Sequence, residues 1–129
     1  LAEKVRQSRF CLDEAQIKVI ADALRRHRID AAIATNTTLS REGVEHLAHA
    51  DEAGGLSGAP VFGKATTVLG ALSRHLGSEI PLIGVGGVMD GPSARAKLEA
   101  GAQLVQLYTG LIYRGPALVK EAIESTRDS

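Results

Sequence analysis

The sequence has few of the features that mark secreted, membrane-spanning or nucleic-acid-binding proteins. Its 129 residues include one cysteine, which excludes an internal disulfide framework and suits a reducing cytosol. No apolar run approaches the ~20 residues that a membrane-spanning helix requires, and the first residues lack a signal-peptide pattern. Lysine plus arginine balance aspartate plus glutamate at 15 each, without a basic stripe, so nucleic acid is not an expected partner. We expect a cytoplasmic protein.

Aromatic residues are also scarce, at 3% of the chain with no tryptophan, although 44% of the residues are hydrophobic. Isoleucine, valine, leucine and alanine must therefore fill the core of what is long enough to be one domain. Residues 1–12 are charged and weakly patterned, and we interpret them as a leader separate from the domain at 13–129. Cys11 in this leader has no activating neighbour and is interpreted as a plain apolar residue.

Helical and strand patterns alternate along the rest of the chain. They predict helices at residues 13–28, 41–49, 64–76, 93–100 and 117–123, and strands at residues 29–34, 80–85 and 103–107. Strands that alternate with helices form parallel sheets. Three strands are too few for an ordinary doubly wound domain, and a complete (β/α)8 barrel needs about 250 residues. The order predicts an α/β fold that forms the C-terminal part of such a TIM barrel.

The stretch from Ile80 to Gly87 is the most informative one. A buried strand ends in Gly86 and Gly87, and Asp90 or Ser93 can cap the helix that follows. Glycines let the backbone approach a ligand closely, and N–H groups beside a helix N-terminus bind anions. The pattern fits a phosphate site, and it equally fits a tight strand-to-helix connection without a ligand.

Polar or glycine-rich segments follow the other strands as well. Residues 35–38 (TNTT) follow the first strand, where α/β folds place ligand groups, although threonine and asparagine also cap helices and form turns. Residues 52–63 contain four glycines and can close over a ligand. Tyr108, Thr109 and Gly110 follow the last strand. In a barrel these segments share one mouth, where phosphate sites lie after the last two strands.

Three histidines are given no functional role. His27 belongs to the basic end of the first helix, where positive charge complements the helix dipole. His46 and His49 have a spacing that a metal could bridge, but no cysteine or carboxylate pattern accompanies them. A solvated helix face is the preferred interpretation, and no metal site is predicted.

Four motifs carry a family resemblance. They are IATNTT at 33–38, GGLSGxP at 54–60, PLIGVGGV at 81–88 and GAQLVQLYTGLIYRGP at 101–116. In this order and spacing they resemble dihydroorotate dehydrogenase, in particular its class 2, the membrane-associated and quinone-reducing branch of pyrimidine biosynthesis. The likeness covers residues 14–123.

The resemblance implies a barrel enzyme that uses flavin mononucleotide (FMN) to oxidise dihydroorotate to orotate, with a quinone as electron acceptor. It implies hydrogen bonds to the orotate amide and carboxylate groups, close backbone approach to the flavin, and N–H and hydroxyl donors to the flavin phosphate. The implied cofactor contacts are Thr35, Gly58, Gly86, Gly87, Tyr108 and Thr109, and the implied substrate contacts are Asn36 and Thr37.

The resemblance assigns no catalytic base, because class 2 enzymes carry a serine base on a loop upstream of the helix that begins here near Asp13. We therefore expect an inactive fragment of a parent enzyme that is peripheral on the cytoplasmic face of the inner membrane. A non-catalytic flavin- or phosphate-binding half-barrel and another FMN or sugar-phosphate barrel stay open as alternatives. A partial barrel exposes sheet edges, which favours self-association.

Overall fold

The computed structural model describes residues 12–127, so Cys11 and the rest of the expected leader before Leu12 lie outside the described residues. In chain order the elements are α2 (Glu14–Arg26), β1 (Ala32–Ala34), the 3-10 turn η1 (Ala59–Val61), α3 (Phe62–Leu76), β2 (Leu82–Gly84), α4 (Gly91–Glu99), β3 (Leu104–Val105), α5 (Thr109–Arg114) and α6 (Ala117–Thr126). No helix in this part of the chain is long and apolar enough to cross a membrane.

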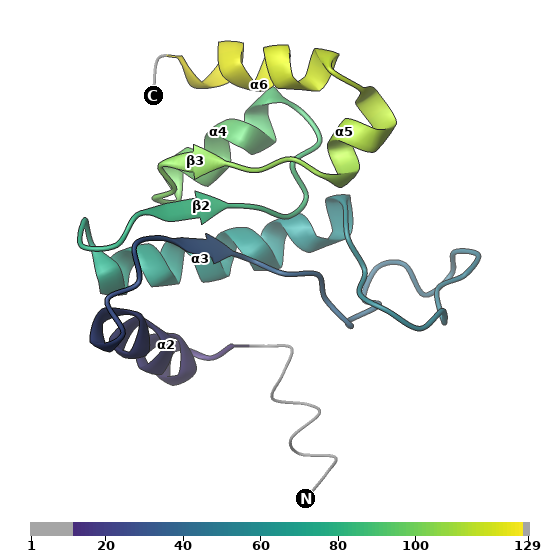
Figure 1. Ribbon diagram of the computed structural model, residues 1–129. Helices are drawn as coiled ribbons and strands as arrows, with labels where there is room; N and C mark the ends of the chain where they lie inside the picture. The colour runs from purple at the N-terminus through teal and green to yellow at the C-terminus, as the bar shows by residue number, and fades with distance from the viewer. Residues whose placement is uncertain (1–11, 128–129) are drawn as a thin grey trace, which may run out of the picture.

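The three strands form one parallel sheet in the order β1–β2–β3. Ile33 pairs with Ile83, and Ile83 pairs with Leu104. Helices α3 and α4 lie behind this sheet in Figure 1, so they cover one of its faces. On the other face Ile33 and Leu104 are 61% and 62% exposed. The predicted α/β class is confirmed, and the sheet keeps one open apolar face.

The core lies between the covered face of the sheet and the helices. Helix α3 runs along this face and contributes Leu69, Leu72 and Leu76, against which Ile17 of α2 and Leu82 of β2 pack. A second, smaller cluster joins Ala94 of α4, Ala122 of α6 and Val88 in the segment after β2. The buried hydrophobic residues of 12–127 are all aliphatic. The expectation from the aromatic-poor composition is confirmed.

Two helices begin with reciprocal side-chain caps. Asp13 accepts from the backbone N–H of Gln16 at 2.8 Å, and Asp90 accepts from that of Ser93 at 2.8 Å. Each partner side chain bonds back to the capping backbone, which satisfies N–H groups that a helix start leaves without partners. The predicted cap near the start of α4 is confirmed, with Asp90 as the capping residue.

The predicted helix at 41–49 is wrong, because these residues form successive turns. Gly43 and His49 have φ values of +83° and +66°, which are outside the helical region. The sequence analysis also missed α5, a short helix that begins at Thr109 directly after the last strand segment. The strands are shorter than predicted: β1 begins only at Ala32, and β3 contains only Leu104 and Val105.

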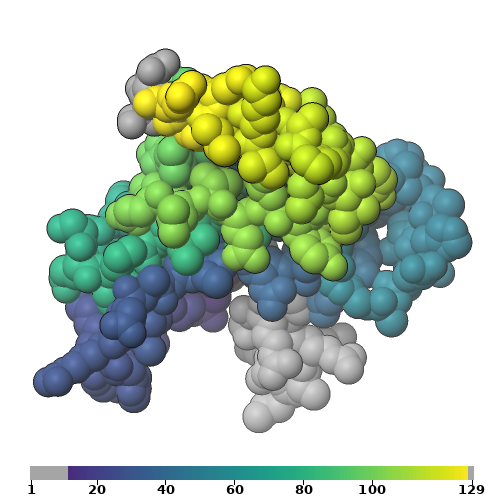
Figure 2. Space-filling view, turned by 45° about the horizontal axis from the view of Figure 1, so that its top comes forward, coloured from purple at the N-terminus to yellow at the C-terminus, as the bar shows by residue number. Residues whose placement is uncertain are grey.

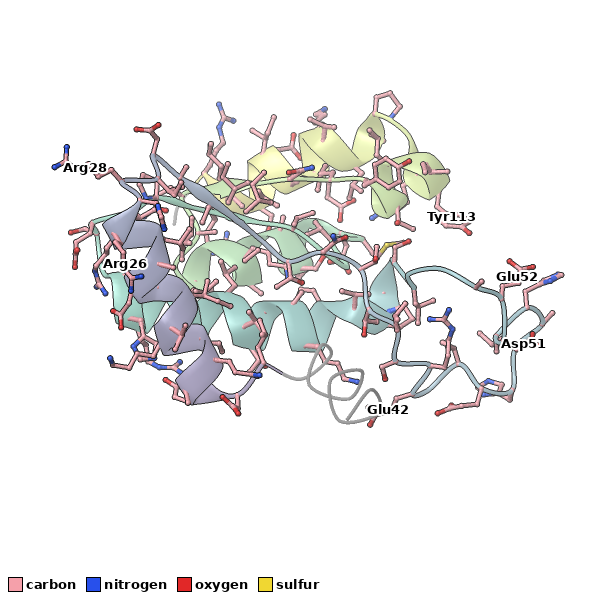
Figure 3. All side chains as sticks on the ribbon, turned by 60° about the horizontal axis from the view of Figure 1, so that its bottom comes forward. Arg26, Arg28, Glu42, Asp51, Glu52 and Tyr113 are labelled. Atoms are coloured by element: carbon pink, nitrogen blue, oxygen red, sulfur yellow. The ribbon has the colours of Figure 1, made fainter. Side chains whose placement is uncertain are left out.

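The basic end of α2 is only partly a solvated helix end. Arg26 and Arg28 point into solvent in Figure 3. Arg25, however, binds Glu79 with its Nε at 2.8 Å and also donates to the carbonyl of His75. This guanidinium therefore joins α2 to the segment that leads into β2.

Candidate functional site

The turns that follow the three strands converge on one cavity of about 390 Å³. They leave the sheet on the side to which the strand arrows point in Figure 1. The cavity is lined by Ile33, Thr35, Asn36, Thr37, Ser57, Gly58, Val61, Val85, Gly86, Gly87, Val88, Gln106, Tyr108, Thr109 and Gly110. All eight residues proposed from the sequence as cofactor or substrate contacts are among them. Their roles toward a ligand stay predictions.

The turn after β2 is built on glycines that leave no room for side chains. Gly86 and Gly87 have φ values of +99° and +74°, which L side chains rarely adopt. A Cβ at Gly87 would lie 2.4 Å from the Cβ of Phe62, the first residue of α3. The backbone of this turn is therefore packed directly on the start of α3, which makes it a stiff part of the cavity wall.

The segment that follows this turn is fixed by polar contacts. Ser93 accepts from the backbone N–H groups of Met89 and Asp90 at 3.0 Å each. The hydrogen bonds that Asp90 receives from Ser93 lower the pKa of its carboxyl group. Arg114 donates to the carbonyl of Met89 at 2.9 Å and pairs with Glu121 at 2.8 Å. Helices α5 and α6 thereby hold the start of α4 in place.

The turn after β3 lies against the turn after β2. A Cβ at Gly110 would lie 2.2 Å from the carbonyl oxygen of Val88, so the two backbones are in close contact. Tyr108 is 70% exposed at the start of α5. The hydroxyl of Thr109 donates to that of Ser57 at 3.0 Å, which connects this turn to the glycine-rich loop.

The turn after β1 leaves the sheet through a cis peptide bond between Ala34 and Thr35. The amide oxygen of Asn36 accepts from the backbone N–H of Thr37 at 2.8 Å and from its hydroxyl at 3.4 Å. The amide NH2 group of Asn36 is then the donor that remains for a ligand. The hydrogen-bonding groups that this turn offers to the cavity are therefore uncharged.

The glycine-rich loop reaches both polar turns. A Cβ at Gly55 would lie 1.9 Å from the hydroxyl oxygen of Thr37. Gly58 has a φ of +79°, and a Cβ there would lie 3.1 Å from Cγ2 of Thr109. The stretch from Gly55 to Gly58 therefore fits closely between the residues that follow β1 and those that follow β3.

One buried charge lies behind the cavity wall. Lys97 of α4 is fully buried, donates to the Thr66 hydroxyl at 2.9 Å and has its Nζ 5.0 Å from the centre of the Phe62 ring. Thr66 in turn donates to the carbonyl of Phe62 at 2.7 Å. Burial lowers the pKa of Lys97 to about 8. The ammonium group does not line the cavity, but it contacts the first turns of α3, on which Gly87 packs.

Sequence reasoning missed two polar residues of the cavity, Ser57 and Gln106. Ser57 lies in the GGLSGxP motif and Gln106 in the GAQLVQLYTGLIYRGP motif. The motifs therefore identified the right segments but not these two residues. His46 and His49 are not among the residues that line the cavity. Both are exposed, and Nδ1 of His49 lies 2.8 Å from the Glu52 carboxylate. Within residues 12–127 no group of three metal-ligating side chains occurs.

Comparisons with known proteins agree with the fold. The family profile described as dihydroorotate dehydrogenase matches residues 11–128. A dihydroorotate dehydrogenase (quinone) of Azoarcus sp. is 64% identical over 117 residues, which cover 91% of this chain and 35% of the relative. The enzyme of the same name from Burkholderia multivorans is 62% identical over 114 residues, covering 88% of this chain and 33% of the relative.

Solved structures give the same result. A dihydroorotate dehydrogenase of Eimeria tenella crystallised with ferulenol superimposes with a TM-score of 0.83 at 30% identity, over 91% of this chain and 31% of that one. The ligand-free enzyme of this organism gives the same TM-score. These neighbours are TIM barrels, of which the three strands and flanking helices form a part. The chain spans about a third of the length of the relatives that it matches, and it belongs to the dihydroorotate dehydrogenase family.

Proposed function

We propose that this chain supplies the phosphate-binding turns and part of the substrate-binding wall of an FMN-dependent dihydroorotate dehydrogenase that reduces a quinone. The observation that carries the proposal is the convergence of three strand-end turns on one cavity. The names of the relatives support the reaction and the acceptor. The proposal places the complete protein in pyrimidine biosynthesis, peripheral on the cytoplasmic face of the inner membrane.

The donors around the turns after β2 and β3 fit a phosphate group. The backbone at Gly86 and Gly87 can approach an anion closely because neither residue carries a Cβ. Tyr108 and Thr109 add backbone N–H and hydroxyl donors from the neighbouring turn. Among the residues that the structure describes, no lysine, arginine or histidine lines the cavity. Binding would therefore depend on neutral donors of fixed geometry, each of which makes a strong hydrogen bond to a charged oxygen.

The turn after β1 fits the uncharged amide groups and the carboxylate of a pyrimidine such as orotate. Asn36 offers its NH2 group, and Thr37 offers a hydroxyl whose position is limited by Gly55. FMN, when bound, supplies the hydride-accepting chemistry. The chain's own residues bind the substrate, orient it, and exclude water through apolar side chains such as Val61 and Val85.

A binding role without catalysis is the second candidate. Within residues 12–127 the cavity lining contains no carboxylate, histidine, lysine or cysteine, and the hydroxyl of Ser57 accepts from Thr109. This observation favours a flavin- or phosphate-binding unit over a complete catalytic centre within the described residues.

Titration of the chain with FMN and, in parallel, with riboflavin tests the proposal. We expect saturable FMN binding and about tenfold or more weaker riboflavin binding, because riboflavin lacks the phosphate. Equal affinity for the two flavins, or no binding of either, would refute the phosphate assignment. Gly87→Ala should weaken FMN binding, whereas Gly63→Ala, at a helical glycine with no neighbour within 4 Å, is the matched control.

Anaerobic addition of dihydroorotate to the FMN-loaded chain separates the two candidates. Loss of the flavin absorbance would show oxidation by groups within this chain and would exclude the binding-only role. Unchanged absorbance, with oxidation by the complete gene product, would favour the binding-only role for these residues.

We also propose that the described residues self-associate through their open sheet. Ile33 and Leu104 are exposed on the uncovered face, and β1 and β3 are edge strands with unpaired backbone groups. Light scattering after size exclusion should give a mass above that of one chain. Ile33→Lys should reduce this mass, because it places a charge on the open face. A mass of one chain at all concentrations of the unaltered protein would overturn the expectation.

A further inference from the structure

The loop between Thr38 and Leu56 is held chiefly by one guanidinium group. Lys64 of α3 adds hydrogen bonds to the side chains of Ser40 at 2.9 Å and Glu42 at 2.8 Å. It forms a separate lobe beside the sheet in Figure 1 and, in blue, in Figure 2, and Figure 3 shows Glu42, Asp51 and Glu52 along it. Val44 is the buried hydrophobic residue within 39–55, so an apolar core does not account for its shape. The hydrogen bonds of Arg41 account for most of the shape of this loop.

All five N–H donors of Arg41 are directed at backbone carbonyl oxygens of this loop. Its Nε donates to the carbonyl of Ala50 at 2.8 Å, and its Nη2 donates to those of Glu52 and Gly54 at 2.8 Å each. Its Nη1 lies 3.4 Å from the carbonyls of Thr38 and Leu39. The guanidinium therefore binds both ends of the loop at once.

We propose that Arg41 is a positioning residue that sets the substrate-binding wall of the cavity by fixing the loop that supports Thr37. The proposal rests on the proposed function of that cavity. Within residues 12–127 Arg41 is not part of the cavity lining, and the carbonyls to which it donates belong to residues outside that lining. Its influence passes through the loop backbone.

The path from Arg41 to the cavity is short. Of the two carbonyls that Nη2 binds, that of Gly54 immediately precedes Gly55 and that of Glu52 lies three residues before it. Gly55 contacts the Thr37 side chain so closely that no Cβ fits. Backbone hydrogen bonds between Thr38 and Leu56, of 3.0 Å and 2.6 Å, run beside this contact. A shift of the loop would therefore move the groups that face a pyrimidine.

The turn after β2 does not depend on this guanidinium. Gly87 packs on Phe62, and Gly86 packs on Val61 and Ala65, all at or within the start of α3. Loss of Arg41 should consequently affect the pyrimidine ligand more than the flavin phosphate. This difference distinguishes a positioning role from a general loss of folding.

The test compares Arg41→Gln and Arg41→Lys with the unaltered protein, using the complete gene product. Amide hydrogen exchange at Thr38 and Leu56 reports the loop directly, and titrations with FMN and with orotate report the two sides of the cavity. Arg74→Gln is the matched control, because Arg74 is 67% exposed and pairs only loosely with Glu14 at 3.5 Å.

We expect Arg41→Gln to accelerate exchange at both amides and to raise the orotate Kd about tenfold or more, with a much smaller change in the FMN Kd. Arg41→Lys should recover part of the loss, since an ammonium group can bind some of the five carbonyls. Equal losses for orotate and FMN, or unchanged exchange and affinity, would overturn the proposal. If the unaltered protein bound neither ligand, the proposed function would fail, and unchanged exchange in Arg41→Gln would still refute the loop assignment.

Discussion

Replacement of the buried Lys97 by methionine should remove a pH-dependent part of the stability of this fold. Methionine keeps the length and most of the volume of lysine but carries no charge. Lys97 is fully buried, and its ammonium group contacts the Thr66 hydroxyl and the Phe62 ring. No carboxylate compensates the charge within the described contacts, and desolvation is the cause of its lowered pKa.

The sign of the effect follows from proton binding. In the unfolded chain the lysine keeps its proton up to a pKa of 10.5, whereas in the folded protein it loses it near pH 8. Between these values the unfolded state binds more protons, so the free energy of unfolding rises with pH. Below pH 8 both states are charged and the burial penalty is constant. Between about pH 8 and pH 10.5 the free energy of unfolding of the wild-type chain should therefore rise by about 3 kcal/mol relative to that of Lys97→Met.

Urea unfolding of both proteins from about pH 7 to about pH 10.5 measures this difference. Other lysines and the tyrosines also titrate in this range, but subtraction of the Lys97→Met curve removes their contributions. Lys120→Met, at a side chain that is 80% exposed, should leave the pH dependence unchanged. If the curves of wild type and Lys97→Met ran parallel, the ammonium group would not be desolvated in the folded state and the reasoning would be refuted.

Two further substitutions test the turn after β2. Gly87→Ala should destabilise the fold by about 2 kcal/mol or more, because the new Cβ meets Phe62 at 2.4 Å and φ is positive, while Gly63→Ala should be neutral or slightly stabilising; thermal unfolding measures both. Asp90→Ala should cost about 1 kcal/mol through loss of the α4 cap. Since the folded-state pKa of Asp90 is lowered, its contribution is present above pH 3.8 and is lost as the pH falls below it, so the two proteins should converge in acid.

The sequence predicted the features that depend on local pattern. The apolar run before Gly86, the cap at Asp90 and the polar turn at Asn36 are all set by neighbouring residues, and the structure has them where the patterns indicate. Parallel pairing then brings these strand ends together, because the carboxyl ends of parallel strands share one edge. This convergence agrees with the family resemblance, which assigned eight residues from four separate segments to one site.

What the sequence could not show depends on contacts between distant residues. Val44 and Leu47 have helical spacing, but that spacing does not reveal that Arg41 binds the carbonyls of the segment and holds it as turns. The hydrogen bond between Ser57 and Thr109 joins residues that are 52 positions apart. From the sequence, Lys97 would be expected on the surface of its helix. In the structure it is fully buried, and Gly84 approaches its Cβ closely.

The two sides of the cavity are stabilised by different forces. The turns after β2 and β3 are in van der Waals contact with helix starts, and such packing resists small displacements because every shift creates a clash or a void. The turn after β1 is supported by a loop with little buried apolar surface, and its position is maintained by directional hydrogen bonds that water can replace. A ligand that contacts both sides would therefore find its phosphate site preformed and would order the other wall as it binds. On this argument, amide exchange in the loop should slow when a pyrimidine is added to the FMN-loaded protein, whereas FMN alone should protect chiefly the glycine turns.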